Sequence, residues 1–135
     1  MSNLPIFDVA GSAMQAQSVR LSTVASNLAN ANTVAGTAEG AYRAKQPVFS
    51  AEPVQGDPTL AGVQVLEVRE SDAAPVRRYD PGNPLADPQG YVYAPDVDPV
   101  AQMVDMISAS RSYQANVEVF NSAKELAVAT LSMGR

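Results

Sequence analysis

The sequence predicts a mainly α-helical fold with a small β part, in which long N- and C-terminal helices form a coiled-coil hairpin and the middle forms a small antiparallel β domain. Nine of the ten prolines lie between Pro47 and Pro99, whereas residues 6–32 and 100–135 contain none. Proline disrupts a helix interior, so its absence permits a long helix at each end. Apolar residues also recur every seven positions in both proline-free segments, which is the spacing of a helix–helix seam.

This pattern divides the chain into three parts. We expect an N-terminal coiled-coil helix at 1–33, a linker and small β-rich middle domain at 34–96, and a C-terminal coiled-coil helix at 97–135 that packs with the N-terminal one.

The first helix carries an apolar stripe but very few charges. Its seventh places are taken by Phe7, Met14, Leu21 and Leu28. Asp8 and Arg20 are its only charged residues, and three asparagines crowd LSTVASNLANANT, residues 21–33. Asparagine competes with helical hydrogen bonds, but its amide can donate and accept across an interface without the cost of burying a charge. We therefore expect this helix to be buried by other chains.

The last helix has a clear start and a less regular stripe. Asp98 can cap its first turn, and Pro99 suits the first helical position. Its apolar residues in seven-residue register are Met103, Met106, Tyr113, Val117, Phe120, Ala127 and Leu131, with Val104 and Ile107 beside them. Ser110 and Lys124 interrupt the stripe.

Both stripes are candidates for an assembly interface, since apolar and small uncharged residues suit contact with several neighbours. The predicted interface comprises Phe7, Met14, Leu21, Val24, Asn27, Leu28, Asn30, Val104, Ile107, Tyr113, Val117, Phe120 and Leu131. We expect Leu28 and Leu131 to be buried between helices, whether of the same chain or of a neighbour.

Four short strands are predicted between the helices, because β-formers alternate with polar residues there. They are AYRAKQPVF (41–49), GVQVLEVRE (62–70), VRRY (76–79) and GYVYA (90–94). A loop dense in turn residues, YDPGNPLADPQG, separates the last two. We expect a small antiparallel sheet or a pair of hairpins, preceded by a flexible link at 33–40.

The composition argues against a chemical site. The chain has a net charge of −5, scattered basic residues, no cysteine and no histidine. Four carboxylates near the proline-rich loop could bind calcium or act as an acid–base pair: Asp80, Asp87, Asp96 and Asp98. Aspartate beside proline or glycine is ordinary turn chemistry, however, and Asp98 is already a cap. We predict no catalytic residue, cofactor or metal, no nucleic-acid partner and, without about 18 continuous apolar residues, no membrane insertion.

Four stretches resemble the bacterial flagellar rod, hook and hook-associated axial family. They are FDVAGSAMQAQSVRLSTVASNLANANT, GAYRAKQPVF, YDPGNPLADPQGYV and MVDMISASRSYQANVEVFNSAKELAVATLSMGR. The resemblance implies a structural subunit of the proximal rod, whose terminal helices pack into a hollow helical shaft that transmits torque from the motor to the hook. It also implies copies of itself and the rod proteins FlgB, FlgF, FlgG and FliE as partners. Export through the flagellar type III apparatus, without a cleaved signal peptide, and assembly in the periplasm would follow.

Other functions stay open at this point. The chain could be another axial rod subunit, similar to FlgB, or a soluble helical-hairpin adaptor or export chaperone. A chaperone should be a folded dimer in isolation. An enzyme using the aspartate loop would need a pocket and an activity that the monomer retains.

Overall fold

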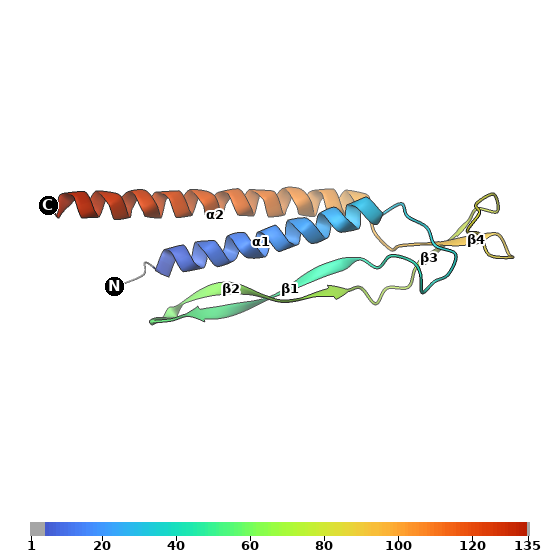
Figure 1. The fold of residues 1–135 in the computed structure, drawn as a ribbon, viewed down its shortest axis with the longest axis horizontal. Coiled ribbons are helices and arrows are strands. Elements are labelled where there is room, and N and C mark those ends of the chain that lie inside the picture. Colours follow the sequence, from blue (N-terminus) through green and yellow to red (C-terminus); the bar gives the residue numbers. More distant parts are fainter. Residues whose placement is uncertain (1–4, 135) are drawn as a thin grey trace.

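The computed structural model describes residues 5–134 and shows an elongated molecule with a long helix at each end of the chain (Figure 1). The elements follow in the order α1 (Pro5–Asn30), β1 (Lys45–Val54), β2 (Asp57–Glu70), β3 (Val76–Tyr79), β4 (Tyr91–Ala94) and α2 (Pro99–Met133). A long helix is thus present at each end of the chain, as predicted, although α1 ends three residues before the predicted boundary at 33, and residues 1–4 and 135 of the predicted segments lie outside the described residues. The Asp98 cap is also confirmed, because its Oδ1 accepts a hydrogen bond from the backbone N–H of Val100 at 2.9 Å.

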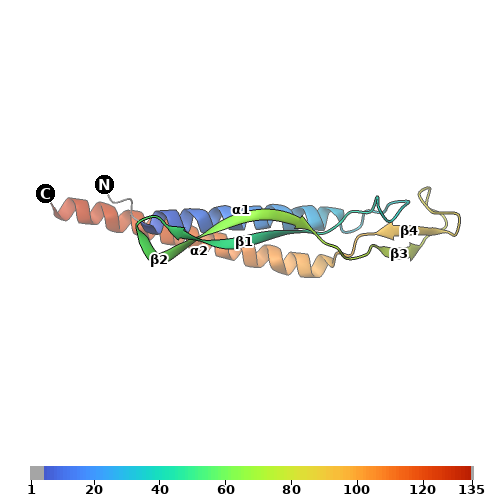
Figure 2. The same ribbon diagram turned by 90° about the horizontal axis from the view of Figure 1, so that it is seen from below.

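Helix α1 is the middle of three layers. Helix α2 runs antiparallel along one side of it, and the β1–β2 hairpin lies along the other (Figure 1). In the view turned by 90°, the hairpin still overlies α1 (Figure 2). Within residues 5–134, the hairpin packs on α1 but not on α2. The chain thus has two terminal helices and a small antiparallel β part, as predicted, but one hairpin belongs to the helical body.

The β part consists of two separate antiparallel hairpins. The first hairpin is longer than predicted. Its first strand begins at Lys45 and not at residue 41, and it continues to Val54. Its second strand begins at Asp57, five residues before the predicted start at 62. Pro53 and Pro58 lie inside the two strands, because a two-stranded hairpin has two open edges that tolerate proline. The register shifts beside Pro53, and Gly56 completes the turn at a φ of 97°.

The second hairpin lies at the far end of the molecule and matches the prediction. Val76 pairs with Ala94, and Tyr79 pairs with Tyr91. The predicted flexible link at 33–40 is instead tied to this hairpin, because the N–H and C=O of Ala35 both bond Tyr93, at 2.8 and 2.9 Å. Pairing of isolated backbone groups in this way leaves no periodic signal in a sequence.

The core is built mostly from small side chains. Its buried apolar residues are Ala10, Ala16, Val24, Ala31, Ala41, Val92, Ala109 and Ala123. Alanine lets helix backbones approach closely but removes little apolar surface from water, so each contact stabilises the subunit only modestly. Many larger apolar side chains, such as Leu66, Ile107 and Leu131, are exposed on the surface of the subunit.

The hairpin turn makes a testable electrostatic prediction. Thr59 donates to Asp57 Oδ1 from its hydroxyl at 2.6 Å and from its backbone N–H at 2.9 Å, and these bonds lower the pKa of Asp57 below its ordinary value of 3.8. The Thr59→Val variant should raise this pKa, with the backbone bond retaining part of the lowering. An NMR titration of the Asp57 carboxyl measures it. Because the folded-state pKa is lowered, the turn is stabilised above pH 3.8 and loses this contribution as the pH falls below that value. An unchanged midpoint in Thr59→Val would refute the role of the hydroxyl.

Candidate assembly interface

The seam between α1 and α2 holds several of the predicted interface residues. The rings of Phe7 and Phe120 meet edge to face, with centroids 4.8 Å apart and planes at 66°. Farther along, the partly exposed side chains of Arg20 and Asp105 form an ion pair between the two helices, which contributes little because solvent screens it. Val24 on α1 is buried. These contacts hold the two helices of one chain together.

Asn27 is the best-enclosed polar side chain of α1, at 2% exposure. Its Nδ2 donates to the C=O of Lys45 at 2.8 Å and to Oε1 of Gln102 at 3.0 Å. Its Oδ1 accepts from the Lys45 N–H at 2.8 Å and from the Tyr42 hydroxyl at 2.9 Å. The amide thereby uses both donors and both acceptor positions.

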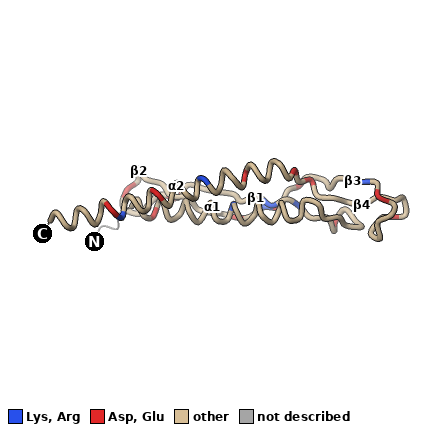
Figure 3. Tube along the Cα trace, turned by 90° about the horizontal axis from the view of Figure 1, so that it is seen from above, with Lys and Arg blue, Asp and Glu red and all other residues tan. Residues whose placement is uncertain are grey.

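Asn27 is therefore already covered within its own chain. All four groups that it bonds belong to this chain, and the start of β1 supplies two of them. Asn30 behaves differently, because its Nδ2 bonds the Ser26 C=O one turn earlier on its own helix at 2.9 Å. Figure 3 shows how sparse charge is along α1, which suits a helix covered on two sides.

Other predicted interface residues point away from the seam. Val104 is 62% exposed and Ile107 is 57% exposed, and Tyr113 is also on the surface. Val100 and Met103 extend this exposed apolar strip along the N-terminal half of α2. Within residues 5–134, no element of the same chain covers these side chains.

The C-terminal end of α2 extends past the start of α1 (Figure 1). Helix α2 has 35 residues and α1 has 26, so the last turns of α2 lack the neighbouring helix. Leu131 is 73% exposed there, and Leu126 and Met133 are similarly uncovered. The other predicted interface residues are half-buried in the subunit: Met14, Leu21, Leu28, Asn30 and Val117.

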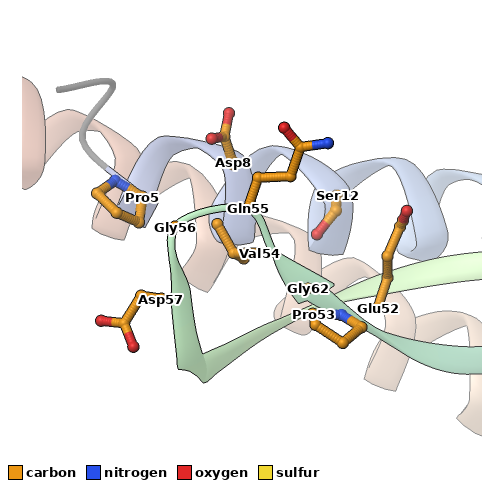
Figure 4. A pocket seen from close by; sticks show the side chains of 10 residues that line it. All are labelled: Pro5, Asp8, Ser12, Glu52, Pro53, Val54, Gln55, Gly56, Asp57 and Gly62. Carbon is orange, nitrogen blue, oxygen red and sulfur yellow. The ribbon is translucent and has the colours of Figure 1, made fainter. Parts of the chain in front are cut away.

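An open cavity of about 710 Å³ lies between the first turns of α1 and the tip of the β1–β2 hairpin (Figure 4). Asp8, Glu52 and Asp57 contribute carboxylates to its lining, together with Ser12. The lowered pKa of Asp57 makes it a poor proton donor near neutral pH. The Ser12 hydroxyl is already engaged, because it accepts from the Val63 N–H at 3.1 Å and donates to the Val9 C=O at 2.9 Å.

The aspartates of the proline-rich loop act mainly as turn residues. Asp87 Oδ1 accepts from the N–H groups of Gln89 and Tyr91, both at 2.9 Å. Asp80 accepts from Asn83 Nδ2 at 3.3 Å, and Asp96 is exposed. In the part of the chain that the structure describes, no three carboxylates gather in a way that could hold a metal ion. Nor is any of the described helices long and apolar enough to cross a bilayer.

Several residues that organise this region were missed from the sequence. Gln102 looks like an exposed polar residue in the first turns of the last helix, and nothing in its spacing marks it as a partner of Asn27. Tyr42 lies in a stretch predicted as strand, but it precedes β1 and points its hydroxyl at α1. Ser12, whose Oγ accepts from the Val63 N–H at 3.1 Å, is one of many serines on α1.

The turn function of the aspartates predicts a negative result. Changing Asp80, Asp87 and Asp96 together to alanine should remove local loop contacts without removing calcium affinity or catalysis. Isothermal titration with calcium should give the same absence of a micromolar, stoichiometric signal for parent and variant. A calcium signal that the parent shows and the variant lacks would contradict this prediction.

Comparison with known proteins identifies the family. A family model described as flagella basal body rod protein matches residues 7–36, and one described as flagellar basal body rod FlgEFG protein C-terminal matches residues 89–133. The first match covers most of α1, and the second covers β4 and α2. The flagellar basal-body rod protein FlgC of Salmonella typhimurium is 53% identical over 135 residues, covering all of both chains. That of Escherichia coli O6:H1 is 54% identical with the same coverage. The Aquifex aeolicus FlgC is 44% identical over 119 residues, covering 88% of this chain and 87% of the relative. The chain therefore belongs to the FlgC family of flagellar basal-body rod proteins, as a structural subunit of the rod.

Proposed function

We propose that this subunit builds the proximal part of the rod, by packing its terminal helices against those of neighbours into a hollow helical shaft that transmits torque from the motor to the hook. The observation that carries this proposal is the uncovered apolar surface of α2. Val104, Ile107 and Leu131 are all more than half exposed, on the element where a family model for rod proteins matches.

The exposed strip is too apolar for a solvated helix face. A soluble helix usually presents charge opposite its packed side, whereas Val100, Met103, Val104 and Ile107 are consecutive members of one exposed strip. Full burial of each such side chain contributes about 1.5–3 kcal/mol. Repeated in every copy, this burial favours association of subunits over isolated chains.

The predicted interface residues then have two functions. Phe7, Val24, Asn27 and Phe120 hold the helices of one subunit together. Val104, Ile107, Tyr113 and Leu131 contact neighbouring subunits, with the half-buried Met14, Leu21, Leu28, Asn30 and Val117 at the border between the two sets. In this arrangement the helices form a coiled-coil inner layer, and the middle of the chain, including β3 and β4, lies outside it.

The partners follow from membership of the family. We propose contacts with other copies of this chain and with the rod proteins FlgB, FlgF, FlgG and FliE, in the periplasmic part of the basal body. Export by the flagellar type III apparatus would deliver the chain unfolded, without a cleaved signal peptide. The function is mechanical, and the proposal includes no catalytic activity, cofactor or nucleic-acid partner.

The isolated chain should be largely monomeric and less helical than α1 and α2 together imply. Its seam is built on alanines, and long helices without packing partners are marginal in water. Circular dichroism and size-exclusion chromatography measure both properties. A cooperatively melting monomer with full helicity would count against folding coupled to assembly, and a folded dimer would favour the alternative of an adaptor or export chaperone.

Changing Leu131 to Asp should block assembly and change the isolated chain only slightly. Leu131 is exposed in the subunit, so the carboxylate costs little there beyond its lower helix propensity and its charge at the C-terminal end of α2. At a subunit contact the carboxylate would be buried unpaired, at a cost of roughly several kcal/mol. The Leu131→Met variant is the matched control, since it keeps an apolar side chain of similar size. Swimming and the amount of variant in purified basal bodies give the readout.

The Leu28→Asp variant should also prevent assembly, but by a different route. Leu28 is half-buried within the subunit, so this change should lower the residual helicity of the isolated chain as well. Normal swimming of either aspartate variant, with the variant present in basal bodies, would show that the two stripes are not assembly interfaces.

A further inference from the structure

We propose that Asn27 is a latch that holds the β1–β2 hairpin on the helix pair, so that the subunit keeps all three layers together in the assembled rod. The proposal rests on the proposed function only in taking the rod as the place where it is tested. It assigns a positioning role to one amide within the charge-poor helix.

The amide of Asn27 pairs with the hairpin as a peptide group of a neighbouring strand would. It donates to the Lys45 C=O and accepts from the Lys45 N–H, both at 2.8 Å. Lys45 is the first residue of β1, and a hairpin edge leaves such backbone groups without a strand partner. Asn27 therefore satisfies the backbone groups on the open edge of β1 at its first residue.

The same amide also reaches the other layer. The Asn27 Nδ2 group also donates a hydrogen bond to Gln102 on α2. Its Oδ1 accepts a hydrogen bond from the Tyr42 hydroxyl, which lies 3.0 Å from Ser26 Oγ. One side chain thus joins α1, α2 and the start of β1. An aspartate has the same shape but no N–H donors, so it would face the fixed Lys45 C=O with oxygen, and Gln102 would have to turn its amide to donate instead.

The hairpin has a second close contact with α1 at the opposite end. Ser12 Oγ accepts from the Val63 N–H at 3.1 Å and donates to the Val9 C=O at 2.9 Å. Gly62 beside it is buried, and a β-carbon placed there would lie 2.8 Å from Ser12 Oγ. Fifteen residues of helix, about 22 Å, separate this contact from Asn27.

Apart from these two polar contacts, the hairpin is held on α1 by packing alone. It packs on α1 alone among the helices of the described chain, and Leu66 and Val68 are exposed on it. With Ser12 altered, Asn27 is the main polar attachment that remains. The position of the hairpin should then depend on the Asn27 amide.

A disulfide can report the position of the hairpin. The Ser12 β-carbon lies 3.5 Å from the ideal β-carbon position of Gly62, which is within disulfide range. The chain has no cysteine, so Ser12→Cys with Gly62→Cys introduces a single possible intramolecular pair. Oxidation of purified basal bodies, followed by a non-reducing gel, gives the rate of crosslinking in assembled rods.

Assembly is compared first without the cysteines. Asn27→Asp should lower the amount of subunit in basal bodies by about tenfold or more, because a buried amide loses two donated bonds. Asn116→Asp is the matched control, since that amide bonds only the Ser112 C=O of its own helix, at 2.8 Å, and it should assemble normally. Tyr42→Phe removes one of the four bonds and should have a smaller effect.

The cysteine pair then separates hairpin placement from general destabilisation. In the parent background the pair should crosslink in assembled rods. In the Asn27→Asp background, one expected result is that the cysteine pair crosslinks about tenfold more slowly. The other is that the disulfide, formed under oxidising conditions, restores incorporation of the subunit into basal bodies, and that a reductant removes this gain.

Several results would overturn the latch. They are normal assembly of Asn27→Asp, parental pairs that enter the rod without crosslinking, and an Asn27→Asp pair that crosslinks at the parental rate while its assembly defect stays unrelieved by the disulfide. Failure of the unaltered chain to enter basal bodies would instead overturn the proposed function.

Discussion

Burial of the Asn27 amide is the constraint on which the arrangement of the layers depends. A buried amide is costly unless each donor and acceptor finds a partner. Asn27 finds them only where the start of β1, the residue Tyr42 before it and Gln102 on α2 converge. The requirement is directional, unlike apolar packing, so it fixes the relative position of three elements that alanine contacts alone would leave free to slide.

The chain divides its apolar residues between two purposes. Alanines and a few aromatic and valine side chains close the seam inside the subunit, as in the contact of Phe7 with Phe120. The larger aliphatic residues of α2, such as Ile107 and Leu131, stay on the surface. A subunit built this way gains little stability by itself and much on association, which suits a component of a permanent assembly.

The scarcity of charge on α1 is explained in part by cover within its own chain. The helix lies between α2 and the β1–β2 hairpin, so two of its sides face protein within the same chain. Small polar residues such as Ser12 and Thr23 accommodate the close approach. Thr23 is buried and returns its hydroxyl hydrogen bond to the backbone of its own helix, at 2.9 Å to the Arg20 C=O.

The sequence by itself determined the two helices, the Asp98 cap and the short β3–β4 hairpin, because periodicity, capping and turn chemistry act over a few neighbouring residues. The family could also be inferred, since its motifs are contiguous. Only the tertiary structure decided what Asn27 bonds, that the hairpin extends through Pro53 and Pro58, and that Ala35 is tied to β4. Each of these depends on polar groups far apart in the sequence meeting in three dimensions. The meeting of Asn27 and Gln102 across 75 residues is set by the packing of whole elements, and no local pattern records it.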